Sequence, residues 1–273
     1  SFWMLFRLLE VNVMSEKREV ILEAKHVTRR FAASHGRTLL ANNDINLKMY
    51  KGETLGLVGE SGCGKSTIAG ILAAKNRGYN GEITIGGVPL NEVNETNLMQ
   101  RVVLVRHNSY LFKGTVEENL KMAKPDATKE EMEAVLQKVN LLGFLQTQDG
   151  LQTQLLEKAS NLSGGQCQRL VIARALLRTD SAVYIFDEAA SNIDVESEEL
   201  IMNVIHELAK TKTVLLISHR LANVVKSDKI YFLKDGEIKE SGKHDELMSR
   251  NGAYRHLYES QMALENYGKG GMA

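Results

Sequence analysis

Several features are scarce or missing in this chain of 273 residues, and each absence excludes a class of protein. The two cysteines, Cys63 and Cys167, lie far apart without metal-ligand spacing, which excludes a disulfide scaffold and fits thiols in a reducing cytosol. With 2 prolines, the chain is not collagen-like. The 34 basic residues balance the 34 acidic ones, so a net charge of 0 gives no global attraction to nucleic acid. No apolar run reaches about 18 residues, so no segment spans a bilayer unaided.

The first 19 residues differ in character from the rest of the chain. Residues 2–13 (FWMLFRLLEVNV) are apolar but short, are interrupted by Arg7 and Glu10, and lack the layout of a signal peptide. Two interpretations stay open: a docked helix or an incidental chain end, and a membrane-surface helix or the remnant of a membrane domain. We therefore predict that residues 1–19 are an N-terminal extension.

The rest of the chain has the composition of a folded globular protein, with 43% hydrophobic and 25% charged residues. A block of helical character occupies residues from about 115 to 178, and within it residues 129–140 carry apolar side chains at helical spacing. A last helix is predicted over residues 254–265. Alternating strands and helices indicate an α/β fold with parallel strands, and the block indicates an inserted helical subdomain. Strands are predicted over residues 20–27, 44–49, 54–58, 82–85, 102–105, 182–186, 213–217 and 229–233.

A phosphate-binding loop is the most specific motif. Residues 59–67 (GESGCGKST) match G-x-x-x-x-G-K-S/T between a strand-like run and a helical pattern predicted over residues 66–75. Glycines let backbone N–H groups approach phosphate oxygens, Lys65 reaches the β- and γ-phosphates, and the Ser66 hydroxyl can ligate Mg²⁺. The helix adds the positive end of its dipole. The sequence therefore predicts a nucleoside triphosphate site formed by Gly59, Glu60, Ser61, Gly62, Cys63, Gly64, Lys65, Ser66 and Thr67.

Two further motifs complement this loop. An apolar strand ends at Asp187, which is placed to hold magnesium, and Glu188 follows and can polarise an attacking water. Taken alone, these acids fit a structural strand with solvated ends equally well. Residues 162–166 (LSGGQ) open a helix predicted over residues 168–178, and small residues at a helix start can bind an anion. The alternative for this motif is an ordinary helix start capped by Ser163.

These motifs, in this order and spacing, resemble the nucleotide-binding domain of ATP-binding cassette (ABC) transporters over nearly the whole chain. Residues 185–194 (IFDEAASNID) resemble its magnesium strand and D-loop, and residues 217–220 (ISHR) resemble its switch histidine. The resemblance implies a P-loop NTPase core with a mixed sheet, an antiparallel β subdomain and an inserted α-helical subdomain. It places this domain at residues 20–265 and leaves residues 266–273 as a flexible tail.

The resemblance also implies a function. It implies ATP hydrolysis with Mg²⁺ in a head-to-tail dimer at the cytoplasmic face of a membrane. The implied partners are a second nucleotide-binding domain and the transmembrane domain of a transporter, with no nucleic acid. The implied catalytic residues are Lys65, Glu188 and His219, and the implied magnesium ligands are Ser66, Asp187 and His107. Beyond the phosphate loop, the implied nucleotide contacts are Phe31, His107, Ser163, Gly164, Gly165, Gln166 and Asp194.

A few positions indicate the subtype within the family, and others depart from the family's pattern. Residues 111–119 (LFKGTVEEN) and Glu157 resemble the exporter form of the family, whereas residues 52–64 would suit a peptide importer equally well. We expect an exporter-type domain whose membrane part is not in this chain. His107 stands where the family has the Q-loop glutamine, and Ala190 replaces a usual D-loop threonine. Imidazole suits softer metals than magnesium, so His107 is either a ligand or a solvated loop residue. Two alternatives stay open: a regulatory cassette that binds ATP with little hydrolysis, and a soluble ABC ATPase outside transport.

Overall fold

An antiparallel sheet forms one end of the molecule. The computed structural model describes residues 18–32, 37–191 and 193–270, so most of the predicted N-terminal extension and the last three residues lie outside the described part. The sheet has the strand order β2-β1-β4-β5. Its two long strands pair along most of their lengths, which confirms the predicted antiparallel β subdomain. The strands are β1 (Val20–Ala32), β2 (Thr38–Tyr50), β4 (Asn80–Ile85) and β5 (Val88–Pro89).

A second, mixed sheet forms the centre, with the order β12-β11-β3-β10-β9-β6. All neighbouring pairs are parallel except β11 and β12. Every residue of β3, β9 and β10 is buried, as expected of parallel strands covered on both faces. The strands are β3 (Thr54–Gly59), β6 (Val102–Arg106), β9 (Val183–Asp187), β10 (Thr213–Ile217), β11 (Lys229–Lys234) and β12 (Glu237–Gly242).

Successive side chains of these strands point to opposite faces of the central sheet, so the hydrophobic core has two parts. In β9, Tyr184 and Phe186 belong to the cluster that packs against the helical subdomain. Val183 and Ile185, on the opposite face, belong to the cluster shared with the antiparallel sheet. Helix α2 (Lys65–Leu72) lies in this second cluster, between the two sheets. The start of α2 is thereby held rigidly at the carboxyl end of β3.

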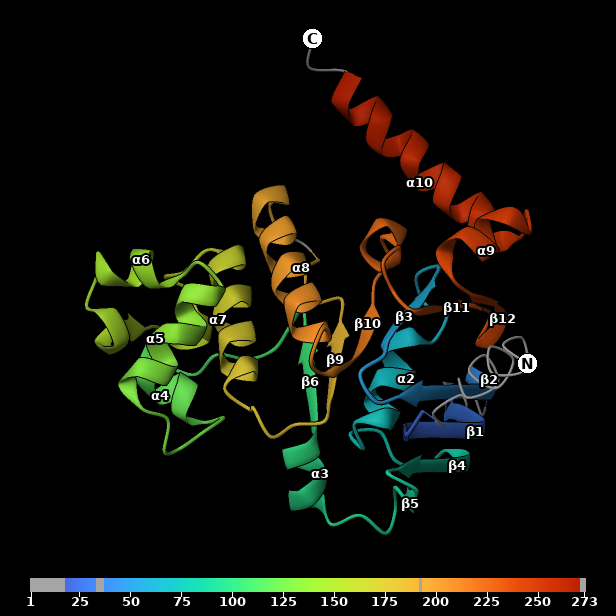
Figure 1. Ribbon diagram of the computed structural model, residues 1–273, viewed down its shortest axis with the longest axis horizontal. Helices are drawn as coiled ribbons and strands as arrows, with labels where there is room; N and C mark the ends of the chain where they lie inside the picture. Colours follow the sequence, from blue (N-terminus) through green and yellow to red (C-terminus); the bar gives the residue numbers. More distant parts are fainter. Residues whose placement is uncertain (1–17, 33–36, 192, 271–273) are drawn as a thin grey trace, which may run out of the picture.

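Four helices between β6 and β9 form the predicted helical subdomain, at the end of the molecule away from the antiparallel sheet (Figure 1). Three of them begin with capping boxes, at Thr115, Thr128 and Ser163, so the sequence itself fixes where these helices start. A small sheet of β7 (Gly114–Thr115) and β8 (Gln154–Leu155) closes the subdomain. The helices are α4 (Val116–Lys121), α5 (Lys129–Lys138), α6 (Leu142–Gln146) and α7 (Gly164–Leu176).

Some predicted helix boundaries are wrong. Helix α2 ends at Leu72 rather than residue 75, and α7 covers Gly164–Leu176 rather than residues 168–178, because its capping box starts it earlier. Helix α10 (Ala253–Gly270) extends beyond the predicted 254–265, since an established helix adds one hydrogen bond for each further residue. The flexibility of residues 266–273 stays a prediction. Three further helices were not predicted from the sequence: α3 (Glu95–Arg101), α8 (Val195–Ala209) and α9 (His244–Ser249).

Within the described residues, no helix is both long and apolar enough to cross a membrane.

Candidate functional site

The phosphate loop joins β3 to α2, and its glycines are required by its geometry. Gly59 has a φ of 149°, and a Cβ built there would lie 2.0 Å from the carbonyl oxygen of Leu233 on the neighbouring strand β11. Gly64 has a φ of 100°, and its Cβ would lie 2.3 Å from the carbonyl oxygen of Ala41 on β2. The loop is therefore packed against both sheets at positions where a side chain cannot fit.

Lys65 is the first residue of α2, and its side chain is folded against the loop. The residue is 4% exposed, and its Nζ donates hydrogen bonds to the carbonyl oxygens of Gly59 (2.9 Å) and Glu60 (2.8 Å). The Sγ of Cys63 lies 3.5 Å from the same Nζ, on the buried side of the loop. The Cys63 thiol is thus buried beside Lys65, and Lys65 supplies the positive charge of the loop.

The two oxygen donors predicted for magnesium lie in contact. Ser66 Oγ donates a hydrogen bond of 2.8 Å to Asp187 Oδ1 across the gap between α2 and β9. Among the described residues, no group of three or more His, Cys, Asp or Glu side chains could hold a metal ion. A hydroxyl and one carboxylate fit Mg²⁺, because this ion takes oxygen ligands and completes its shell with waters and substrate phosphates.

Asp187 is 2% exposed, and its environment was only partly predicted. Burial raises the pKa of this carboxyl, while the Ser66 hydrogen bond and the charge of Arg106 lower it. Arg106 Nε lies 3.4 Å from Asp187 Oδ2, because Arg106 and Asp187 are partners in the parallel pairing of β6 with β9. Arg106 was not among the site residues predicted from the sequence. The available signal was a basic residue that ends an apolar strand next to His107.

Glu188 directly follows Asp187 at the end of β9 and lies near His219, which follows β10. β9 and β10 are parallel with Asp187 opposite Ile217, so the residues that follow the two strands emerge side by side. The N–H of Glu188 donates to the carbonyl oxygen of Ile217 at 3.0 Å, and His219 Nδ1 lies 3.9 Å from Glu188 Oε1. Glu188 has a φ of 53°, a region that only a few per cent of non-glycine residues occupy. The carboxylate of Glu188 and the imidazole of His219 are thus adjacent acid–base groups at the edge where α2 begins.

His107 and Phe31 are less clearly placed for their predicted roles. His107 is exposed, and its backbone N–H donates to the carbonyl oxygen of Asp187 at 3.3 Å. Phe31 lies on β1, where the guanidinium carbon of Arg29 is 4.5 Å from the centre of its ring. Magnesium binding by His107 and adenine stacking by Phe31 therefore stay predictions.

The LSGGQ motif forms the start of α7, away from the phosphate loop. Ser163 Oγ accepts from the N–H of Gln166 (3.2 Å), and Gln166 Oε1 accepts from the N–H of Ser163 (2.9 Å). Ser163 and Gly164 are exposed. A Cβ on Gly165 would lie 3.1 Å from Asp194 Oδ2, so the motif and the predicted D-loop aspartate are neighbours. Figure 1 shows α7 and α2 on opposite sides of β9, so the chain does not bring these two anion sites together by itself.

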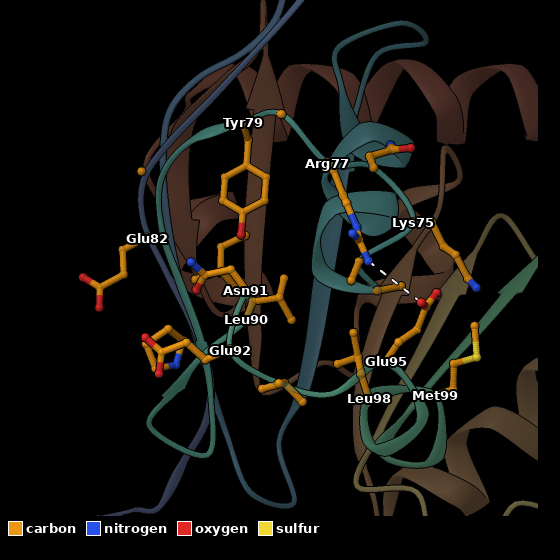
Figure 2. Close-up of a pocket in the computed structure, with 18 residues that line it drawn as sticks. Lys75, Arg77, Tyr79, Glu82, Leu90, Asn91, Glu92, Glu95, Leu98 and Met99 are labelled. Atoms are coloured by element: carbon orange, nitrogen blue, oxygen red, sulfur yellow. Dashed lines mark ion pairs between the residues drawn. The ribbon is translucent and has the colours of Figure 1, made fainter.

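A separate cavity of about 600 Å³ lies at the opposite end of α2. Figure 2 shows Lys75, Arg77 and Tyr79 on one side of it, with Arg77 paired at 4.0 Å to Glu95 of α3. None of its lining residues belongs to the phosphate loop or to the strand that carries Asp187. The nucleotide motifs therefore define a site that is distinct from this cavity.

Comparison with known proteins agrees with the geometry. The sequence profile of the family described as "ABC transporter" matches residues 42–191. The chain belongs to the ABC transporter family. It is 44% identical over 96% of its length to an uncharacterized ABC transporter ATP-binding protein of Haemophilus influenzae, and covers 47% of that protein. It is 41% identical over 83% of its length to the ATP-dependent lipid A-core flippase of Escherichia coli K12, of which it covers 39%.

A solved structure of an ABC transporter also resembles the chain. The structure of a bacterial Atm1-family ABC exporter with ATP bound superposes with a TM-score of 0.81 at 29% identity, over 90% of this chain and 42% of that one. The chain therefore spans less than half the length of these relatives. Its similarity to exporters agrees with the subtype expected from the sequence, and the chain is an ABC transporter ATPase domain.

Proposed function

We propose that this domain binds and hydrolyses Mg-ATP between two copies arranged head to tail, and thereby powers solute movement through a transmembrane domain of the exporter type. The observation that carries the proposal is the convergence of four side chains at one edge of the central sheet. Ser66 Oγ lies 2.8 Å from Asp187 Oδ1. Glu188 is the first residue after β9 and His219 the second after β10, and His219 Nδ1 lies 3.9 Å from Glu188 Oε1.

Each group has a defined task in this proposal. The phosphate loop and Lys65 bind the β- and γ-phosphates, and Ser66 and Asp187 hold the magnesium ion, which neutralises phosphate charge when bound. Glu188 accepts a proton from the attacking water at a carboxylate oxygen, and His219 Nδ1 lies 3.9 Å from Oε1 of that carboxylate. The balance is ATP and water giving ADP, phosphate and a proton.

A second copy is proposed because one chain leaves the site incomplete. Ser163 and Gly164 are exposed at the N-terminus of α7, where free N–H groups favour an anion, yet α7 lies apart from the phosphate loop in the same chain. A second copy in the opposite orientation would present its α7 to the γ-phosphate. Loss of that phosphate would remove the contacts that hold the two copies together. Because the proposal couples the domain to a transmembrane domain, it also places the domain at the cytoplasmic face of the membrane.

The proposal is tested with Glu188→Gln, which keeps the shape of the side chain and removes its proton acceptor. We expect the variant to bind Mg-ATP, to turn over at least about 100-fold more slowly, and to double in mass by light scattering with ATP. Glu92→Gln, a change to an exposed acid beside the separate cavity, is the matched control and should behave as the unchanged chain. A Glu188→Gln variant that hydrolyses ATP normally would contradict the proposal. An unchanged chain that binds Mg-ATP without turnover would instead favour the regulatory cassette.

A further inference from the structure

The loop that carries His219 is held by its backbone rather than by its imidazole. Strand β10 ends at Ile217, and a short 3₁₀ helix, η4 (Leu221–Val224), follows the loop. The His219 side chain is 49% exposed, and its Nδ1 stands 3.9 Å from Glu188 Oε1, which is too long for a hydrogen bond. The position of the imidazole therefore depends on whatever fixes the main chain on either side of it.

The Gln261 side chain of the C-terminal helix hydrogen-bonds two backbone groups of this loop, one at His219 and one at Leu221. Gln261 Nε2 donates a hydrogen bond of 2.6 Å to the carbonyl oxygen of His219, and Gln261 Oε1 accepts one of 2.9 Å from the N–H of Leu221. The two contacts join residues 42 and 40 positions apart in the sequence. A side-chain amide offers one donor edge and one acceptor edge, so it can pair with a backbone segment as another peptide group would.

The helix that presents Gln261 is anchored independently. Tyr254, near the start of α10, is completely buried, its Oη lies 2.8 Å from His244 Nδ1, and its ring packs at a right angle to Phe232. Tyr254 and Gln261 are seven residues apart, which is close to two helical turns, so they lie on nearly the same face of the helix. Figure 1 shows α10 beginning next to α9 and projecting beyond the sheet. Loss of the Gln261 contacts would therefore leave the anchor of α10 intact.

The other side of the same loop is held by its own polar side chains and by helix α8. Ser218 Oγ accepts from the N–H of Arg220 (3.0 Å) and from Asn223 Nδ2 (3.3 Å). Buried Glu198 of α8 pairs with Arg220 and accepts from Asn223 at 3.1 Å. The loop is thus held by Glu198 of α8 on one side and by Gln261 of α10 on the other. Of these two residues, Gln261 contacts the carbonyl group of His219 itself.

We propose that Gln261 is a positioning residue for His219, and that through it α10 sets the distance between the switch histidine and Glu188. The proposal rests on the proposed function, because His219 must take part in hydrolysis for its position to matter. It makes the placement of α10 a determinant of turnover, although α10 itself carries no nucleotide motif. A ligand or partner that shifts α10 would change turnover through the same two hydrogen bonds.

The kinetic test compares Gln261→Met with Ser260→Ala. Methionine has a similar length and no amide, whereas Ser260 is an exposed neighbour that hydrogen-bonds within its own helix. We expect Gln261→Met to lower kcat about tenfold, since small misplacements of catalytic groups cost that much or more. KM and the calorimetric Kd for Mg-ATP should stay within about twofold of the unchanged chain, because the phosphate contacts are untouched. Ser260→Ala should leave both parameters unchanged.

A double-mutant cycle separates positioning from a general structural defect. In a His219→Ala background, Gln261→Met should lower kcat by less than about twofold further, because the group it positions is already gone. An additive loss would overturn the proposal, and so would an unchanged kcat in Gln261→Met alone. Gln261→Glu keeps the acceptor for Leu221 but places a carboxylate against the carbonyl oxygen of His219, so its kcat should fall at least as far as that of Gln261→Met.

Hydrogen exchange gives a readout without turnover. The Leu221 amide should exchange at least about tenfold faster in Gln261→Met, because it loses its acceptor, and at the normal rate in Ser260→Ala. Equal Leu221 protection in all three chains would overturn the proposal. Failure of the proposed function is distinguishable: the unchanged chain would then not hydrolyse Mg-ATP, whereas failure of this inference leaves its turnover intact and Gln261→Met active.

Discussion

Replacing Asp187 by asparagine should stabilise the chain in the absence of nucleotide and remove most of its response to Mg-ATP. The carboxyl is 2% exposed, and burial raises its pKa despite the opposing effects of the Ser66 hydrogen bond and the Arg106 charge. A raised pKa in the folded state means that ionised Asp187 is less stable there than in the unfolded chain. Asparagine has nearly the same shape, still accepts from Ser66, and carries no charge to desolvate. Its Nδ2 would face Arg106, whose side chain is 34% exposed and can pair with water instead.

The magnitude and its pH dependence follow from proton linkage. The folded chain binds more protons at this site than the unfolded chain between pH 3.8 and the raised folded pKa, so stability falls as the pH rises through that window. The penalty is complete once the pH exceeds the folded-state pKa. Because one pKa unit corresponds to about 1.4 kcal/mol, we expect Asp187→Asn to raise the free energy of unfolding at pH 7 in proportion to the upward pKa shift of Asp187. Each kcal/mol gained raises Tm by about 2 to 4 °C in a domain of this size.

Thermal melts with and without nucleotide measure both effects. Without nucleotide, Asp187→Asn should melt above the unchanged chain at pH 7, with a difference that shrinks as the pH approaches 3.8. At Mg-ATP concentrations about 100 times Kd, the unchanged chain gains about 2.7 kcal/mol and should melt above the variant. Asp126→Asn, at an exposed position, should change neither melt. A nucleotide-free Asp187→Asn that melts below the unchanged chain at pH 7 would refute the reasoning.

Three further outcomes are expected. Lys65→Ala should lose most Mg-ATP affinity in calorimetry, because the one positively charged group of the loop is gone, and an unchanged Kd would refute the phosphate-loop assignment. Gly59→Ala should lower the free energy of unfolding in urea by more than about 2 kcal/mol, because its Cβ would meet a Leu233 carbonyl oxygen, and an unchanged midpoint would contradict this packing. His107→Gln should raise initial ATPase rates at limiting Mg²⁺, since an amide oxygen suits magnesium better than imidazole. Equal rates over a magnesium titration would show that His107 stays off the metal.

The sequence alone determined the parts of this protein that depend on neighbouring residues. The phosphate loop needs glycines and Lys65 within nine consecutive positions, and those positions can be recognised wherever the loop lies. The apolar run that ends in Asp187 predicts a buried strand with an acid at its carboxyl end. The helical periodicity of residues 129–140 predicted the start of α5 at Lys129, whereas α7 begins at Gly164 rather than at the predicted residue 168. Helix α8 is also amphipathic but was missed, because its Asp194 cap was assigned to the D-loop alone.

Only the tertiary structure decided which distant residues meet. Arg106 reaches Asp187 because β6 happens to be the strand next to β9, and Glu188 meets His219 because β10 lies between β9 and β3. Gln261 reaches the backbone of His219 because Tyr254 is buried and fixes the direction of α10. Strand order and helix direction result from burying apolar surface over the whole chain, so no local pattern of residues contains them.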